Sequence, residues 1–298
     1  MINLIFALLF SQKILAASCC GGGSSSSMII TSDNRREISI GFTSRTDIGQ
    51  TDQNGWSTFN NHQIIDGKSI FNLQYGEQVA ENFQLGVKTA IAEKHVKKSG
   101  KDEKTQGFTD LELQTTYEYL PEYTYHPYKP RGFIYTKLSI PLSKSIYNSQ
   151  SSILSDVRGS GLYSASLGNF LIKKLDLVTL KVGFEFTKTF AKQFSEFKLD
   201  SYHRYTIPIG IAYAFNQSDF SIGFTNTFSY TDEKKFIGNN LSNSHFERFW
   251  DSNIFLNYSP NRQVIYGLSY SDSSIFGESI NSPLYRSVAL NYTYAQEI

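Results

Sequence analysis

Residues 109–119 alternate between apolar and polar side chains with a period of two. One face carries apolar, aromatic or threonine side chains, namely Thr109, Leu111, Leu113, Thr115, Tyr117 and Tyr119. The other face carries acids and uncharged polar groups, namely Asp110, Glu112, Gln114, Thr116 and Glu118. A period of two is the strand period, so the pattern predicts a β-strand with lipid on one side and water on the other. The stretch 107–120 also has the length, about 9–11 residues, that a tilted strand needs to cross a bilayer.

The same alternation recurs along the chain and predicts twelve strands. They cover 37–43, 69–75, 82–92, 107–120, 133–142, 161–172, 178–187, 204–215, 220–230, 251–258, 264–270 and 288–294. The strand 161–172 has the least regular pattern. Pro208 lies inside the strand 204–215 and cannot donate to a β-ladder, so a bulge is expected there.

Connections between these strands alternate in length. Long connections are expected at 44–68, 93–106, 143–160, 188–202, 231–248 and 271–285. Shorter ones are expected at 76–81, 121–131, 173–176, 216–219 and 259–262. Outer-membrane barrels have short periplasmic turns and long outer loops. The chain is therefore predicted to be all-β, a transmembrane antiparallel up-and-down barrel of twelve strands with both termini in the periplasm. Tyr and Phe near the strand ends fit the headgroup level of such a barrel.

Composition agrees with a barrel and argues against other classes. The chain has 298 residues, 19 Tyr, 23 Phe and a formal net charge of +1, so no basic surface for nucleic acid is expected. After residue 17, no apolar run approaches the roughly 18 residues that a membrane helix needs. Mean hydropathy is −0.30, and strands that hide apolar groups at alternate positions barely raise this average.

The N-terminal residues form a separate region. Residues 1–18 have the apolar run and small final residues of a secretory signal peptide. Cys19 follows, and two alternatives stay open: lipidation of Cys19, as in bacterial lipoproteins, or ordinary cleavage that leaves a Cys-Cys pair. Residues 19–36 form a Gly/Ser-rich periplasmic segment, either a lipid tether or a plug that folds back into the barrel, which spans 37–298. With only two adjacent cysteines, no disulfide framework is expected.

Three motifs resemble a known family. Gly107-Phe108-Thr109-Asp110-Leu111, with Tyr119-Leu120, resembles the G-x-x-D-L…Y-x-L strand of bacterial outer-membrane barrels often called phenol-degradation-pathway transporters. Pro141-Leu142-Ser143 stands where that group has a Pro-Thr-Gly hairpin, and Gly159-Ser160-Gly161 resembles its G-x-G entry to the next strand. The resemblance implies a twelve-stranded, porin-like barrel in the outer membrane of a Gram-negative bacterium. Some porin-like relatives form rings that enclose lipid, which implies homo-oligomers as a further possibility.

No catalytic, cofactor-binding or metal site is predicted. The five histidines are scattered and lack zinc-site spacing, and both cysteines lie in the N-terminal region. None of the histidines is followed by a serine two positions later, as an outer-membrane phospholipase strand would require. Glycines 21–23 precede serines rather than a strand-to-helix turn, so they do not form a phosphate loop.

What remains is a predicted polar lumen. Its expected lining residues are Lys88, Glu112, Lys137, Lys181, Glu185, Arg204, Asp251 and Asn253. Lys88 and Lys137 are expected to pair with the acids of 107–120. Barrels of eight strands are filled by side chains and those of 16–18 leave a channel, so twelve strands fit either case. The leading hypothesis is a non-enzymatic channel for small polar solutes that contacts outer-membrane lipid. One alternative is a structural or assembly barrel with a closed lumen, either a lipid-enclosing oligomeric ring or a platform for a partner. Another is an adhesion platform formed by the outer loops.

Overall fold

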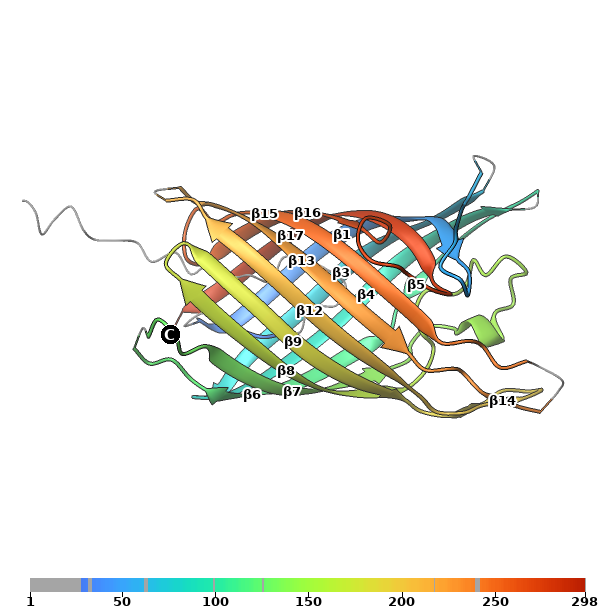
Figure 1. Cartoon of the computed structure of the whole chain (residues 1–298), viewed down its shortest axis with the longest axis horizontal. Helices are drawn as coiled ribbons and strands as arrows, with labels where there is room; N and C mark the ends of the chain where they lie inside the picture. Colours follow the sequence, from blue (N-terminus) through green and yellow to red (C-terminus); the bar gives the residue numbers. More distant parts are fainter. Residues whose placement is uncertain are drawn as a thin grey trace, which may run out of the picture.

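A closed ring of antiparallel strands forms the body of the molecule in the computed structural model (Figure 1). The structure describes residues 28–31, 34–61, 64–98, 100–124, 126–216, 218–238 and 242–297. The predicted signal peptide (1–18), Cys19 and the Gly/Ser-rich residues 21–27 lie outside these ranges. Each strand pairs with its neighbours in the sequence, and β1 pairs with β17 to close the ring. The prediction of a twelve-stranded antiparallel up-and-down barrel is confirmed.

Twelve strands make up the ring. They are β1 (Asn34–Thr51), β3 (Ile65–Ala80), β4 (Phe83–Lys98), β6 (Leu111–Leu120), β7 (Arg131–Ile140), β8 (Ser164–Leu175), β9 (Val178–Thr189), β12 (Tyr202–Ala214), β13 (Phe220–Thr231), β15 (Glu247–Tyr258), β16 (Val264–Asp272) and β17 (Pro283–Glu297). Each predicted strand overlaps one of them. Among the described residues, no helix is both long and apolar enough to span a membrane.

The two ends of the barrel differ. At one end, the turn end, the strands are joined by the short connections 81–82, 121–130, 176–177, 215–219 and 259–263. At the other, the loop end, lie the long connections. They carry β2 (Ser57–Phe59), β5 (Lys101–Phe108), the 3₁₀ helix η1 (Ile146–Asn148), β10 (Lys192–Gln193), β11 (Lys198–Leu199) and β14 (Phe236–Ile237). The N-terminal end of β1 and the C-terminal end of β17 both lie at the turn end (Figure 1).

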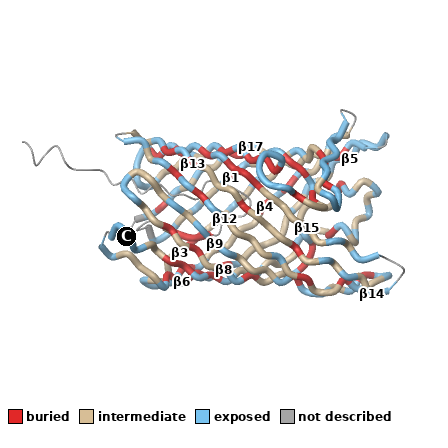
Figure 2. Tube along the Cα trace, viewed as in Figure 1, coloured by how far each residue is buried: buried red, intermediate tan, exposed pale blue. Residues whose placement is uncertain are grey.

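Exposure alternates along the strands, as the lipid and lumen faces require. On β6, Leu113, Thr115 and Tyr117 are exposed while Gln114 and Thr116 are buried. Outward apolar residues align across strands: Leu256, Leu268, Leu290, Phe42, Phe71 and Ile91 are successive cross-strand partners. All six are exposed. Buried and exposed segments therefore alternate along the wall (Figure 2). A continuous apolar outer face of this kind suits contact with lipid chains.

Strands extend further at the loop end than predicted. The expected loop 93–106 is a hairpin, because β4 continues to Lys98 and pairs with β5. The expected loop 44–68 also begins as strand, since β1 runs to Thr51 and then pairs with β2. Outside the lipid, apolar alternation is no longer needed, so hydropathy patterning does not reveal these extensions. The stretch 107–120 is divided between β5 and β6, with a break at Thr109 and Asp110.

The prediction of a bulge at Pro208 is wrong. The ladder between β12 and β13 runs through Pro208, paired with Thr227, without a shift of register. The ladder to β9 keeps the same register on both sides of a gap at residues 207 and 208. The strand accommodates the missing N–H of Pro208 by leaving residues 207 and 208 unpaired with β9. It does not insert an extra residue, as a bulge would. Irregularities of register occur at other places, for example between Asp47 and Gly49 of β1.

A charge on the outward face should destabilise the barrel. Leu290 lies in the outward row on β17 and is 57% exposed. Leu290→Arg should lower the free energy of unfolding from lipid vesicles by about 2–4 kcal/mol, the cost of a cation near the bilayer midplane. Ile275→Arg is the matched control, because Ile275 is equally exposed but lies in the connection 273–282. Equal losses in the two variants, measured by denaturant titration, would contradict a lipid-facing β17.

Candidate functional site

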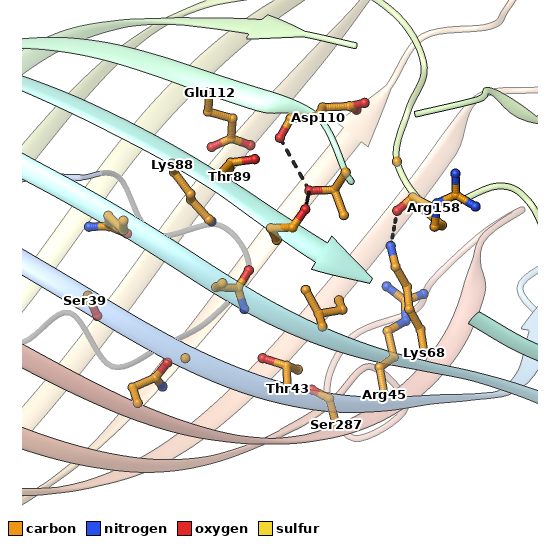
Figure 3. Close-up of a pocket in the computed structure, with 18 of the residues that line it drawn as sticks. Ser39, Thr43, Arg45, Lys68, Lys88, Thr89, Asp110, Glu112, Arg158 and Ser287 are labelled. Carbon is orange, nitrogen blue, oxygen red and sulfur yellow. Dashed lines mark hydrogen bonds between the residues drawn. The ribbon is translucent and has the colours of Figure 1, made fainter. Parts of the chain in front are cut away.

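A cavity of about 300 Å³ lies inside the ring, on the side formed by β1, β3, β4, β6, β16 and β17 (Figure 3). Most of its lining residues are polar and come from inward positions of these strands, with Ile70 and Ala90 among the apolar ones. The lining includes Ser39, Thr43, Asn72, Gln74, Lys88, Glu112, Asn291 and Thr293. Ile29 reaches the cavity from the N-terminal segment, while Arg158 and Gly159 reach it from the connection 141–163. The cavity is therefore bounded by wall strands, by the N-terminal segment and by a loop.

Residues 28–31, here called the strap, are held inside the barrel by two glutamines. Gln114 accepts from the Met28 N–H at 3.2 Å and donates to the Met28 carbonyl at 3.1 Å. Gln84 does the same with Ile30, at 2.9 Å for each bond. Each amide thus matches both the donor and the acceptor of one strap residue, as a neighbouring strand would. These bonds satisfy buried main-chain groups that would otherwise be unpaired.

The side chains of the strap fit gaps in the lumen wall. Gly76 and Gly86 are cross-strand partners on β3 and β4, so no side chain projects from either position. Met28 and Ile30 occupy that space: a Cβ on Gly86 would lie 3.0 Å from the Met28 Cβ, and one on Gly76 would lie 3.6 Å from the Ile30 Cδ1. Ile29 packs into a buried cluster with four inward residues of β7 and β8, namely Phe133, Tyr135, Phe170 and Ile172.

This cluster explains why the pattern of 161–172 is irregular: Phe170 and Ile172 are apolar but face the lumen, where they pack against the strap. The strap is thus anchored on both sides, by amides of β4 and β6 and by apolar groups of β7 and β8.

An ion pair lies beside this cluster and fills the lumen on the side opposite the cavity. Lys137 Nζ lies 3.1 Å from the Glu185 carboxylate, and the Tyr135 hydroxyl donates to Glu185 at 2.8 Å. Thr187 also donates to Glu185, at 3.2 Å. Both charged side chains are less than one-fifth exposed. Charges in such a position are tolerated when each has a partner and further hydrogen bonds.

Two acids of 107–120, Glu118 and Asp110, have other partners than expected. Glu118 binds Arg131 in a two-pronged pair at 2.7 and 2.9 Å. Asp110 accepts from Ser143 at 2.8 Å and from the Ser160 N–H at 2.7 Å. Lys137 pairs with Glu185 instead of with an acid of 107–120. Alternation alone does not show which groups meet across a lumen.

The remaining predicted lumen residues have separate environments. Lys88 and Glu112 are cross-strand partners that line the cavity. Lys181 Nζ lies 4.8 Å from the centre of the Phe170 ring. Arg204 is exposed and its Nε donates to Thr231 Oγ1 at 3.3 Å. Asp251 and Asn253 are buried on β15, where Asn253 donates to Ser271 Oγ at 2.7 Å. In the described part of the chain, no group of three or more His, Cys, Asp or Glu could hold a metal ion.

The connection 141–163 covers the loop end of the cavity and is held by polar contacts. Glu103 of β5 accepts from Ser151 and Ser155, and these hydrogen bonds hold its pKa below the usual value. Asp156 accepts from Ser149, from the Gln150 N–H at 2.9 Å and from Lys144 Nζ at 3.1 Å. Burial alone would raise the pKa of Asp156, but these bonds and the Lys144 charge outweigh it and lower that pKa.

Three basic residues of the cavity were not among the predicted lumen residues. Arg45 and Lys68 fall in the range 44–68, which was predicted as a loop. Both continue the inward alternation of their strands, after Thr43 on β1 and before Ile70 on β3, so a longer window would have included them. Arg158 lies in an irregular loop, where no periodicity indicates its direction.

The fold and lumen define an outer-membrane β-barrel. In fold the chain is similar to the COG4313 outer membrane channel from Pseudomonas putida F1, with 11% identity, a TM-score of 0.67, and coverage of 92% of this chain and 98% of that one. It is also similar to the transport unit of the autotransporter AIDA-I from Escherichia coli, with 10% identity, a TM-score of 0.51 and coverage of 90% and 92%. Identity this low shows a shared fold alone. No protein-family model and no curated protein matches the chain. The predicted resemblance to porin-like transporter barrels is confirmed at the level of fold.

Loss of the Glu185 charge should destabilise the barrel, because it leaves Lys137 inside without a partner. Glu185→Gln should lower the free energy of unfolding by up to about 3–5 kcal/mol. The double variant Lys137→Met/Glu185→Gln removes both charges and should recover most of that loss. Denaturant titration of the double variant and of both single variants, Glu185→Gln and Lys137→Met, measures the coupling. If the loss in the double variant equals the sum of the losses in the two single variants, the 3.1 Å contact carries no interaction energy.

The loop 141–163 should loosen when Asp156 is neutral. A carboxylate with a lowered pKa stabilises the folded loop above its unfolded pKa, near 3.9, and that stability is lost as pH falls through the folded pKa. Asp156→Asn should reproduce the acid state at neutral pH, and trypsin should then cleave within 141–163 faster than in the native protein. Glu233→Gln, at an exposed loop acid, is the control. Equal cleavage rates in all three proteins would contradict this role for Asp156.

Proposed function

We propose that the protein is a non-enzymatic outer-membrane channel for small polar solutes, held closed by its own strap and loop. The observation that carries the proposal is the polar cavity of about 300 Å³ inside a closed ring of lipid-facing strands. Ligand sites for drug-sized molecules span about 300–1,000 Å³, so this one suits a small solute. The similarity in fold to an outer membrane channel supports the proposal.

The lining chemistry favours polar over apolar solutes. Residues with hydroxyl or amide side chains, such as Ser39, Thr43, Asn72 and Asn291, are the most numerous kind among those that line the cavity. Such groups can exchange hydrogen bonds with water for bonds with a solute at little net cost. An apolar solute would leave them unpaired, which costs about 1–3 kcal/mol for each group.

The strap closes the turn end with interactions that can be broken. Its four amide bonds to Gln84 and Gln114 contribute about 1 kcal/mol each in net terms. Residues 28–31 precede β1 and have no ladder of their own, so they can leave the lumen without opening the ring. In this proposal the turn end faces the periplasm, as in other outer-membrane barrels with short turns.

Removing both strap amides should increase conductance. Gln84→Ala/Gln114→Ala eliminates the bonds to Met28 and Ile30 and should raise the single-channel conductance, or the fraction of time open, in planar lipid bilayers. The control is Gln106→Ala, which alters an exposed glutamine of β5 outside the ring. It should conduct like the native protein.

The outcome separates the channel from the closed-lumen alternative. A correctly folded double variant that shows no conductance at any voltage would contradict the channel. It would favour a structural barrel whose lumen stays closed. Folding is checked beforehand by the heat-dependent gel mobility of the barrel.

A further inference from the structure

Basic residues form a row across the loop end of the cavity. Arg45 of β1 is the direct cross-strand partner of Lys68 of β3, and Lys68 is the direct partner of Lys94 of β4. Like charges directly opposite each other on adjacent strands destabilise a sheet. Three basic residues in succession on neighbouring inward positions therefore need groups of opposite charge close by.

At this end of the cavity the loop 141–163 adds a fourth basic residue, Arg158, instead of an acid. Lys68 Nζ donates to the Arg158 carbonyl, and Lys94 Nζ donates to the Leu154 carbonyl at 3.1 Å. These carbonyl oxygens satisfy donors but carry no net charge. Arg158 lines the cavity together with Lys68 and Arg45; its carbonyl faces Lys68 Nζ (Figure 3), and its guanidinium packs against β5. Gly107 makes space for it, since a Cβ there would lie 2.8 Å from Arg158 Nη2.

The acids nearby are occupied by other groups. Asp47 pairs with Arg45 at 2.8 Å, and Asp66 lies 3.7 Å from Lys94. Asp110 accepts from Ser143 and from Ser160, so both its oxygens are used by the loop. Glu112 lies beside Lys88 further along the wall, and Glu37 lines the cavity from β1.

Two cations therefore lack a charged partner. Among the described residues, no carboxylate lies within 4.0 Å of Lys68 or Arg158. Within the described part of the chain, the Arg158 side chain has one long hydrogen bond, to Thr105 Oγ1 at 3.4 Å, and its buried Nε has no partner. A guanidinium and an ammonium from residues that line one cavity present several donors to a single anionic group.

We propose that the loop end of the cavity is an anion-binding site in which Lys68 and Arg158 hold the carboxylate or phosphate of a small solute. This inference rests on the proposed channel function and narrows its solutes to small anions. Arg45, stacked 3.8 Å over the Tyr285 ring and paired with Asp47, raises the local positive potential without being free to bind. Thr43 and Ser287 supply hydroxyls beside the site for the rest of the solute (Figure 3).

Calorimetry on the full-length protein in detergent tests binding directly. The probes are succinate, inorganic phosphate and succinamide, the neutral analogue of succinate. Succinate or phosphate should bind, and succinamide should not. Lys68→Met and Arg158→Gln should each weaken binding about tenfold or more, the scale of one charge-assisted hydrogen bond. Lys98→Met, at an exposed lysine of β4, is the matched control and should bind as the native protein does. Lys68→Arg retains the charge and should restore binding if Lys68→Met folds poorly.

Reversal potentials in planar bilayers under a KCl gradient provide the second measurement. The native protein and Gln84→Ala/Gln114→Ala should prefer anions, and adding Lys68→Met or Arg158→Gln should abolish the preference. Conductance without anion preference, together with no binding of succinate or phosphate, would overturn the anion site but not the proposed channel function. Binding of succinate or phosphate without any conductance would support the anion site and overturn the channel. Equal binding of succinate and succinamide would overturn the site.

Discussion

Closure of the ring by β1 and β17 is the constraint on which the rest of the structure depends. In lipid, every main-chain N–H and C=O must find a partner within the protein, so an open sheet edge is not viable. The ladder between these strands runs from Asn34 and Glu297 to Gln50 and Pro283. Once the ring is closed, each inward position faces a lumen of limited size. The inward side chains must then fill that lumen, leave room in it for water, or do both.

The lumen is divided between these solutions. Along β7, β8 and β9, aromatic side chains and the Lys137–Glu185 pair fill the space, and the strap packs on top of them. Along β1, β3, β4 and β6 the wall side chains are smaller or polar, and the cavity remains. The strap joins the two halves: its amide bonds are to Gln84 and Gln114, and Ile29 belongs to the aromatic cluster. The loop 141–163 then covers the other end.

Alternation predicted the fold well because lipid demands it. A strand that crosses a bilayer must expose apolar groups at every second position, so all twelve crossings were evident. The hairpin of β4 and β5 was missed because water imposes no such pattern. The site was only partly predictable. Lys88 and Glu112 follow from alternation, and Arg45 and Lys68 would follow from extending it. Arg158 and the partners of Asp110 depend on a loop folding back over the barrel, which periodicity does not encode.

The access of water to each side of the lumen tests directly whether one half is hydrated and the other is filled. In a background with Cys19 and Cys20 replaced by serine, single cysteines are introduced at Phe71, Asn72 and Tyr135 and treated with a charged, water-soluble thiol reagent in vesicles. Asn72 lines the cavity, Phe71 faces outward on the same strand, and Tyr135 lies in the filled half. A lumen that is hydrated along β3 and filled along β7 should give fast labelling at 72 and little at 71 or 135. Equal labelling at 71 and 72, or faster labelling at 135 than at 72, would contradict this division of the lumen.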